Sequence, residues 1–172
     1  INCVCVTNSR MFLKGIITSS DFLKIIQEDE KVLIPLSSIM TPKESLSVVH
    51  LDSTVGEVRQ LIITSKIRHI PVVDDHGSIA GCIVDKDIFR VLYEPSSLDI
   101  TDDINNPILQ IPVHKFMNRK PLSIFTKTKL SQAAGIFFEK KIDGCLVLND
   151  NKEVQGIVTL SDFLKIFVGN TE

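Results

Sequence analysis

One segment of this sequence recurs within the chain, and that duplication limits the folds it can adopt. Residues 1–25 align with residues 142–166 without a gap, and the run Ser20–Ile25 is identical to Ser161–Ile166. A third, more diverged copy covers residues 67–92. Roughly half of the positions in the first alignment match, as is typical of a fold built from repeated supersecondary units.

Each copy has the pattern of a β-hairpin followed by a helix. In the last copy, the apolar runs Cys145–Leu148 and Val154–Val158 flank the polar turn Asn149–Lys152, which favours a hairpin. Apolar residues then recur with helical spacing at Phe163, Leu164, Ile166 and Phe167. A hydroxyl and a carboxylate stand where the second strand meets the helix, and unpaired N–H groups at a helix start favour anions.

A further strand and helix precede two of the three copies. Leu46–Val49 is expected to form a short strand. In the last repeat, Leu122–Ile124 is expected to align with Leu46–Val48 of this strand. Thr54 and Glu57 have the spacing of a capping box at the start of the next helix. The corresponding helix of the last repeat is expected at Ser131–Lys140, with Ala133, Ala134, Ile136 and Phe137 facing inward.

The expected organisation is a partial repeat at 1–30, a full repeat at 31–94, a linker at 95–112 and a second full repeat at 113–170. Each full repeat runs strand, helix, strand, strand, helix, which predicts an α/β (α+β) fold with mixed sheets covered by helices. We expect the two full repeats to pack with pseudo-twofold symmetry. The linker is rich in Pro, Asp, Asn and Ser and is expected to be irregular, and Gly169 is expected to end the last helix.

Composition narrows the range of functions. The chain has 172 residues, a net charge of -2 and a pI near 6.1, which argues against nucleic acid as the main partner. No apolar run approaches the roughly 18 residues of a membrane span, and the sequence shows no signal-peptide pattern. Because the chain begins with Ile1, we expect a fragment of a longer protein or a processed form.

Four cysteines, Cys3, Cys5, Cys82 and Cys145, lie in strand-like runs with no zinc-ligand spacing. We expect them to be small buried residues in a reducing, cytoplasmic compartment. The four histidines show no ligand spacing either, so no metal site is expected. No nucleophile is paired with a base in the sequence pattern, so we expect no enzyme activity.

Three short motifs, taken in order, resemble the signature of tandem CBS domains, the cystathionine β-synthase domains that pair as a Bateman module. They are Met40–Pro42, Arg68–Asp74 and Gly156–Asp162. The resemblance covers residues from about 38 to 168, with the half repeat at 1–26 in addition. It implies a regulatory module that binds AMP, ADP or ATP, or else S-adenosylmethionine, and that controls an attached or associated enzyme, kinase, channel or transporter without itself being a catalyst.

The resemblance also implies which residues bind the nucleotide: Thr159, Asp162, Arg68, His69, Ser161, Cys145 and Leu122. Asp162 can accept hydrogen bonds from a ribose diol and Thr159 can donate to ribose or phosphate. Strand edges after Met117 and around Cys145 are expected to form an adenine slot. The other interpretation of Thr159 and Asp162 is purely structural, because their spacing is also that of a helix N-cap and its partner.

The three copies differ at these positions. In the middle copy Val84 replaces the threonine while Asp87 remains, and in the last copy Asp143 stands where the middle copy has Arg68. In the family, basic residues of one repeat reach phosphates held by the other. We therefore expect the better site to combine Thr159 and Asp162 with Arg68 and His69, and Asp87 to mark a weaker second site.

The first copy keeps Thr18 and Asp21, a possible third site, but lacks its own first strand and helix. Missing residues, another chain or packing as an appendage could each account for that half repeat. We expect a homodimer formed through the repeat helices, because Ile63 and Phe138 add apolar surface beyond a single inner face. The competing hypothesis is a scaffold or dimerisation module that binds no ligand.

Overall fold

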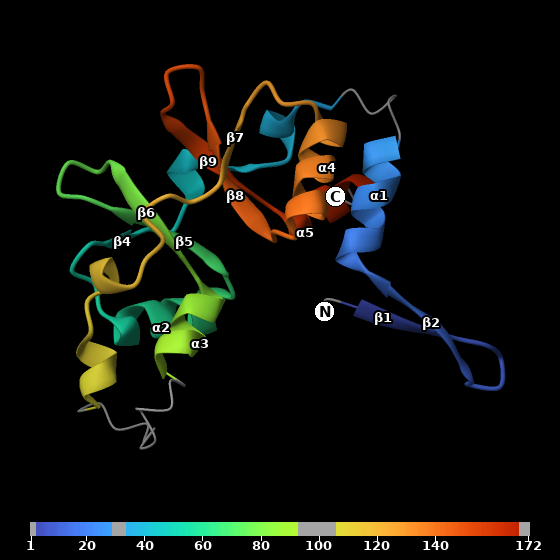
Figure 1. Ribbon diagram of the computed structural model, residues 1–172, viewed down its shortest axis with the longest axis horizontal. Coiled ribbons are helices and arrows are strands. Elements are labelled where there is room, and N and C mark those ends of the chain that lie inside the picture. The colour runs from blue at the N-terminus through green and yellow to red at the C-terminus, as the bar shows by residue number, and fades with distance from the viewer. Residues whose placement is uncertain (1–2, 29–33, 93–105, 169–172) are drawn as a thin grey trace. The chain divides into compact units, whose positions relative to one another are not determined.

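A computed structural model describes residues 3–28, 34–92 and 106–168 (Figure 1). The contacts divide the chain into two units, one of Ile1–Ser45 with Leu122–Glu172 and one of Leu46–Pro121. Each unit holds the strand–helix–strand–strand–helix core of one full repeat, but residues 34–45 belong to the unit of the last repeat and residues 113–121 to the unit of the middle repeat. Each is organised around its own sheet and core.

The first unit contains a four-stranded sheet in the order β3-β9-β8-β7. Strand β7 pairs in parallel with β8, and β9 pairs antiparallel with both β8 and β3. Two helices complete this repeat. The elements are β3 (Thr41–Pro42), β7 (Ser123–Phe125), α4 (Leu130–Lys140), β8 (Gly144–Leu148), β9 (Val154–Thr159) and α5 (Leu160–Val168). The core joins sheet residues such as Val147 and Val158 to Phe137 of α4 and Phe163 of α5.

The second unit repeats this plan with a three-stranded sheet in the order β4-β5-β6. Its elements are β4 (Val49–His50), α2 (Val55–Ser65), β5 (His69–Val73), β6 (Ile79–Val84) and α3 (Asp85–Leu92). The predicted capping box at Thr54 and Glu57 is confirmed, with both reciprocal hydrogen bonds formed. The predicted order strand, helix, strand, strand, helix is therefore confirmed in both repeats, while their pseudo-twofold packing stays a prediction.

The register of the first strands corrects the sequence alignment by one residue. Ile124 lies opposite Val147 and Val49 lies opposite Val72, so Val49 is the counterpart of Ile124. The strand predicted at Leu46–Val49 begins only at Val49, after a 3-10 helix at Lys43–Ser45. A two-residue strand has too short a pattern for its register to be read from sequence.

Part of the segment predicted to be an irregular linker is ordered. Pro107–Gln110 forms a 3-10 helix that the side chain of Asn106 caps, and this helix contacts α2. A second 3-10 helix follows at Val113–Lys115, and another lies at Leu36–Ser38 of the first unit. The capping bond from Asn106 explains why a Pro- and Asn-rich stretch takes a regular form here. Residues 93–105 lie outside the described residues.

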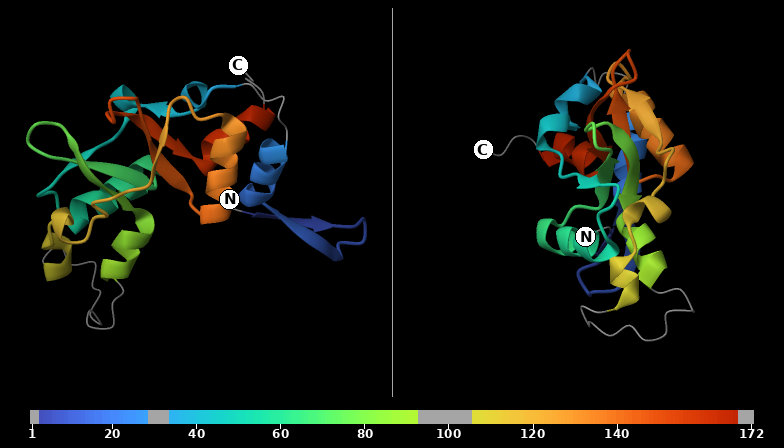
Figure 2. Two further views of the ribbon diagram at one scale, coloured as in Figure 1. Left: turned by 45° about the horizontal axis from the view of Figure 1, so that its top comes forward. Right: turned by 90° about the vertical axis from the view of Figure 1, so that its left-hand side faces the viewer.

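The N-terminal half repeat forms the hairpin β1 (Cys3–Thr7) and β2 (Leu13–Thr18), followed by α1 (Ser19–Glu28). Helix α1 packs on α4 and α5, with Leu23 and Ile26 buried in the core of the first unit. Lys24 lies over the Phe138 ring, 5.0 Å from its centroid. The Phe138 surface that motivated the dimer prediction is therefore covered within the chain. The hairpin projects away from these helices (Figures 1 and 2).

The cysteines divide into two classes. Cys82 and Cys145 are buried as predicted, but Cys3 and Cys5 are exposed, so the prediction of burial is wrong for them. The reason is that β1 and β2 pair only with each other among the described strands. Within residues 3–28, 34–92 and 106–168, no helix is both long and apolar enough to cross a bilayer. Gly169, the predicted helix stop, lies outside those residues.

Candidate functional site

The predicted ribose-binding pair, Thr159 and Asp162, lies where β9 leads into α5. The Oδ2 atom of Asp162 accepts hydrogen bonds from the Thr159 backbone N–H and from Thr159 Oγ1, each 2.8 Å long. Asp162 is only 3% exposed and lies in the first turn of the helix. A carboxylate in this position is stabilised by the positive end of the helix dipole. The structural interpretation of this pair, as a helix start, is therefore present in the fold.

A third donor to this carboxylate is Lys165, which the sequence reasoning missed. Its Nζ atom donates to Asp162 Oδ1 at 2.6 Å, while the lysine side chain is 65% exposed. A carboxylate offers about four acceptor positions, so this geometry leaves room for a further donor on the Oδ1 side. The signal was available in the sequence, because a basic residue follows the aspartate by three positions in every copy, at Lys24, Arg90 and Lys165.

The N-terminal copy builds the same junction. Asp21 Oδ2 accepts from the backbone N–H and Oγ1 of Thr18, each at 2.7 Å. The side-chain hydrogen bond from Thr18, then its backbone hydrogen bond and the nearby charge of Lys24, hold the pKa of Asp21 below its ordinary value. These donors favour the ionised carboxylate, which is the form that accepts hydrogen bonds from a diol.

The middle copy lacks one of these bonds. The backbone N–H of Val84 donates to Asp87 Oδ2 at 3.1 Å, and Arg90 donates to Asp87 Oδ1 at 2.8 Å. Valine has no hydroxyl, so no side-chain donor reaches Asp87 from position 84. The predicted difference between the copies is thus visible at the level of single hydrogen bonds, although its effect on ligand binding stays a prediction.

A backbone segment from the start of the first full repeat lies against β9. Thr41 and Pro42 of β3 pair with Ile157 and Gly156. A Cβ added at Gly156 would lie 2.3 Å from the Thr41 carbonyl oxygen, so only glycine permits this approach. The second unit has a matching contact, in which Asn118 and Cys82 exchange two backbone hydrogen bonds of 3.0 Å beside Gly81. The sequence reasoning did not foresee either strand addition.

These pairings describe the surroundings of the expected adenine slot. The backbone just after Met117 is already bonded to Cys82, and Cys145 lies on the central strand β8, which pairs with β7 on one side and β9 on the other. The Cys145 side chain is 6% exposed, and this burial raises the pKa of its thiol to about 12. The backbone at both places is therefore already paired within the described residues, and the binding of adenine beside it stays a prediction.

The remaining predicted residues of the first unit have simpler surroundings. Leu122 is half-buried, and its carbonyl accepts a hydrogen bond of 3.1 Å from Leu146. Ser161 is exposed in the first turn of α5. A cavity of about 880 Å³ lies near the start of α4, lined by Gln27, Pro35, Lys127, Lys129 and others, but its described lining includes no predicted site residue.

The predicted phosphate-binding residues, Arg68 and His69, belong to the second unit. Arg68 Nε forms a 3.1 Å ion pair with Asp85, and the arginine side chain is 53% exposed. His69 begins β5 opposite Val84 and is half-buried. Their predicted partnership with Thr159 and Asp162 involves the other unit and stays a prediction. Across the described parts of the chain, no three His, Cys, Asp or Glu side chains gather in a metal-binding cluster.

A family model for the CBS domain matches residues 36–94 and 113–169. A CBS domain-containing protein from Dictyostelium discoideum is 26% identical over 125 residues, covering 73% of this chain and 86% of that protein. The chloroplastic protein CBSX1 of Arabidopsis thaliana is 26% identical over 147 residues, covering 76% of this chain and 62% of that protein. This chain thus spans less than two thirds of CBSX1.

Solved structures show the same fold. A Methanocaldococcus jannaschii protein, described as a proposed archaeal homologue of γ-AMPK, has a TM-score of 0.80 at 20% identity and covers 97% of this chain and 59% of its own. CBSX2 of Arabidopsis thaliana in complex with AMP has a TM-score of 0.64 at 23% identity, covering 78% and 96%. The CBS domain pair of protein MJ0100, in complex with 5′-methylthioadenosine and S-adenosyl-L-methionine, has a TM-score of 0.63 at 22% identity, covering 81% and 99%.

Proposed function

The chain belongs to the CBS-domain family, and from that premise we propose that it is a non-catalytic regulatory module that binds an adenine nucleotide: AMP, ADP or ATP. The observation that carries the proposal is the Thr159–Asp162 junction, where a nearly buried carboxylate lies beside a helix start. Two similar folds have been solved with adenosine compounds, AMP in one and S-adenosyl-L-methionine in the other. The regulated protein, whether attached or separate, is part of the proposal.

The ribose part of the proposal rests on Asp162. Its carboxylate already accepts from Thr159 on one oxygen and from Lys165 on the other, and both partners lie within three positions of Asp162, at the end of β9 and in α5. In this proposal the ribose hydroxyls replace or share the Lys165 bond, since that lysine is 65% exposed and can move without loss of buried packing. Ser161 borders the same helix start.

The phosphate part rests on Arg68 and His69. Arginine binds phosphate through a planar set of donors, and its Nε bond to Asp85 uses only one of the five. In this proposal both residues act on the nucleotide that Thr159 and Asp162 hold. The second site, at Asp87, is weaker because Val84 lacks a hydroxyl and Asp143 would repel phosphate.

A ligand-free scaffold is the second candidate function, and one observation favours it. All three aspartates, Asp21, Asp87 and Asp162, accept hydrogen bonds from the residue three positions before them, which begins each helix without any ligand. In this reading the module dimerises through exposed apolar residues such as Ile63, which is 57% exposed. Light scattering at tens of micromolar decides whether the dimer forms.

A thermal-shift screen of AMP, ADP, ATP and S-adenosylmethionine, with adenosine and pyrophosphate as partial ligands, tests the proposal. A nucleotide at about 100 times its Kd adds about 2.7 kcal/mol of stability, which raises the Tm of a chain this long by roughly 5–10 °C. The nucleotide is expected to give a larger shift than adenosine or pyrophosphate. If none of the compounds raises the Tm, the scaffold function is the correct one.

A further inference from the structure

The turn of the N-terminal hairpin has the same backbone geometry as the hairpin turns of the two complete repeats. The N–H of Asn8 donates to the Phe12 carbonyl at 3.0 Å, and the N–H of Met11 donates to the Asn8 carbonyl at 2.9 Å. The same two bonds, each 2.9 or 3.0 Å long, form within residues 74–78 and within residues 149–153. The fourth residue of every turn has a positive φ: 61° at Met11, 74° at Gly77 and 63° at Lys152. The three turns can therefore be compared residue by residue.

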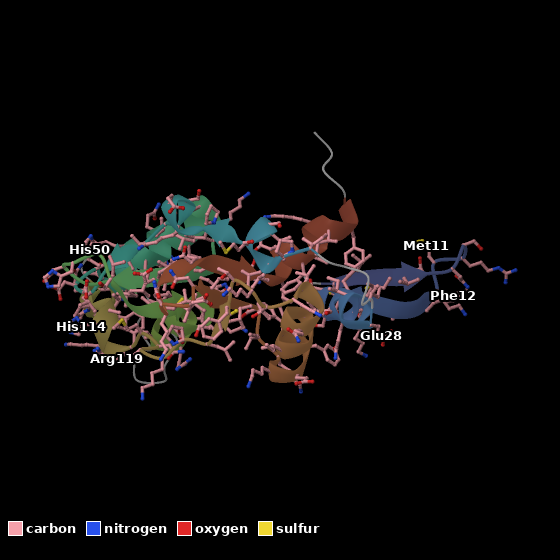
Figure 3. The ribbon with its side chains drawn as sticks, turned by 90° about the horizontal axis from the view of Figure 1, so that it is seen from above. Met11, Phe12, Glu28, His50, His114 and Arg119 are labelled. Atoms are coloured by element: carbon pink, nitrogen blue, oxygen red, sulfur yellow. The ribbon has the colours of Figure 1, made fainter. Side chains whose placement is uncertain are left out.

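The side chains of the first turn differ in kind from those of the other two. Its last two residues are Met11 and Phe12, whose exposed fractions are 80% and 65%. Figure 3 shows both at the end of the hairpin. The other two turns have small or charged residues at these positions: Gly77 and Ser78 in the middle repeat, and Lys152 and Glu153 in the last. Of the three turns, the first alone presents large apolar side chains there.

The exposure of this turn does not depend on what covers its strands. Residues 75–78 and 150–153 are also exposed, although the strands β5 and β8 that lead to them are largely buried. A turn of this type therefore stays in solvent even in a complete repeat. Polar residues are typical of such a position, so two large apolar residues in it indicate contact with another surface.

Basic residues flank the apolar pair on both sides. Arg10 precedes Met11, and Lys14 follows two residues after Phe12. Residues 3–18 contain these two basic residues and no acidic one, although the whole chain has a net charge of -2. At the same two positions the other repeats have no lysine or arginine but His76, Ala80, Asn151 and Gln155. The hairpin is thus a basic extension of an acidic chain, and its charge favours a negatively charged surface as the partner.

We propose that the hairpin tip, residues 10–14, anchors the chain to the surface of an anionic lipid bilayer. Met11 and Phe12 enter the boundary between headgroups and acyl chains, while Arg10 and Lys14 pair with the lipid phosphates and carboxylates. The long stems of these basic side chains can lie beside the apolar pair while their charged ends stay at the headgroups. The tip rests in one leaflet and does not cross the bilayer. The proposal goes beyond nucleotide binding and does not depend on it.

The size of the tip favours lipid over a protein partner. A specific protein interface usually takes roughly 20–30 residues from each side, and the tip contributes only the segment 10–14. A bilayer accepts a small apolar insertion without a preformed pocket, and its anionic headgroups supply the complementary charge. A second copy of this chain is a less suitable occupant, because two identical tips would bring their basic residues together.

Fluorescence of an introduced tryptophan tests whether the tip enters lipid. The sequence contains no tryptophan, so a single indole reports only on its own surroundings. With vesicles of equimolar phosphatidylcholine and phosphatidylserine, the emission of Phe12→Trp is expected to shift to shorter wavelength and to be quenched by lipids brominated on their acyl chains. Ile63→Trp, at a residue of α2 that is 57% exposed, is the control and is expected to show neither change.

A substitution taken from the middle repeat tests the apolar part. Met11→Gly with Phe12→Ser gives the tip the residues Gly77 and Ser78 of the matching turn, and glycine accepts the positive φ of position 11. The double variant is expected to be folded, with an unchanged urea midpoint. Its binding to the same vesicles, measured by cosedimentation, is expected to weaken by at least about tenfold, because two apolar side chains no longer leave water.

A substitution taken from the last repeat tests the charged part. Arg10→Asn with Lys14→Gln is expected to weaken binding by at least about tenfold, since each basic residue beside an anionic leaflet contributes roughly fivefold in affinity. Lys43→Gln with Lys120→Gln makes the same change of net charge at two exposed residues outside the hairpin, and its effect is expected to stay below about threefold. Vesicles of phosphatidylcholine alone are expected to bind the parent chain as weakly as the charge variant binds the mixed vesicles.

The proposal is overturned if the mixed vesicles leave the emission of Phe12→Trp unchanged at low ionic strength, which would assign the tip to a protein partner. Full binding by the Met11→Gly, Phe12→Ser variant also overturns it, as does an equal loss of binding in the Lys43→Gln, Lys120→Gln control. A blue shift of Phe12→Trp that needs no lipid and grows with protein concentration would show that a second copy covers the tip, and this too overturns the proposal.

Discussion

The carboxylate of Asp162 accepts two hydrogen bonds from Thr159, one from its backbone N–H and one from its hydroxyl, both 2.8 Å long. The bonds start helix α5 and fix the carboxylate at the site where the proposal places a ribose. In the proposed function, folding and binding therefore depend on the same side chain. A substitution at Asp162 is informative only if it keeps the helix start, so Asp162→Asn is a better test than Asp162→Ala, because an amide oxygen still accepts from the Thr159 N–H.

Replacing Gly156 with alanine is expected to destabilise the first unit by about 1–3 kcal/mol, the usual cost of overpacking. The added Cβ would lie 2.3 Å from the Thr41 carbonyl oxygen, so β3 must separate from β9. The aligned Gly15 has nothing within 4 Å of its would-be Cβ and gives the matched control. Urea denaturation of both variants measures the difference, and equal stabilities would show that β3 does not lie against β9.

The raised pKa of the buried Cys145 thiol leads us to expect that the folded chain loses stability at alkaline pH. Burial raises its pKa to about 12 in the folded chain, against an ordinary value of 9.0. Between pH 9 and pH 12 the Cys145 thiol loses its proton in the unfolded chain but keeps it in the folded chain. The contribution of this thiol to the free energy of unfolding is therefore complete below pH 9 and is lost as the pH rises toward 12. The loss is at most about 1.4 kcal/mol per pH unit.

The Cys145→Ala variant isolates this effect. It is less stable at neutral pH because a buried side chain is shortened, but its stability should fall less steeply than that of the parent chain between pH 9 and 11. Denaturation curves at several pH values supply the two slopes. Parallel slopes would mean that the Cys145 thiol ionises as readily in the folded chain as in the unfolded one.

The Arg68→Ala variant is expected to weaken binding of ATP and ADP more than binding of adenosine, because the guanidinium acts on phosphate. A charge-assisted hydrogen bond contributes about 1.5–3 kcal/mol, so the loss for the phosphorylated ligands is at least about tenfold. Arg90 is the control, since it is 69% exposed and pairs with Asp87 in the same unit. Equal losses for adenosine and ATP in Arg68→Ala, measured by titration calorimetry, would assign Arg68 a purely structural role.

The sequence was sufficient for the parts of the fold that depend on local patterns. The hairpin-and-helix copies, the capping box of Thr54 and Glu57 and the inward face of α4 all follow from spacing within a dozen residues. The Thr159–Asp162 junction was located in the same way, with both of its interpretations.

The parts that sequence did not predict depend on contacts between distant segments. Pro42 pairs with Gly156 across more than a hundred residues, and neither residue lies in a local pattern that predicts the pairing. The exposure of Cys5 could not be foreseen, since its alternating apolar neighbours look the same whether or not a partner covers them. Lys165 could have been found, because its offset from the aspartate recurs in all three copies.

Calorimetric titration of AMP into the parent chain, Asp162→Asn and Asp87→Asn tests the central proposal most directly, after circular dichroism has shown that all three are folded. A single amide oxygen cannot accept from both Thr159 and a ribose diol as the carboxylate does, so Asp162→Asn is expected to weaken binding at least about tenfold, equivalent to 1.4 kcal/mol. Asp87→Asn is expected to change the Kd by less than about twofold, or 0.4 kcal/mol. Loss of binding in Asp87→Asn with full binding in Asp162→Asn would contradict the assignment of the site, and no binding to the parent chain would contradict the proposed function.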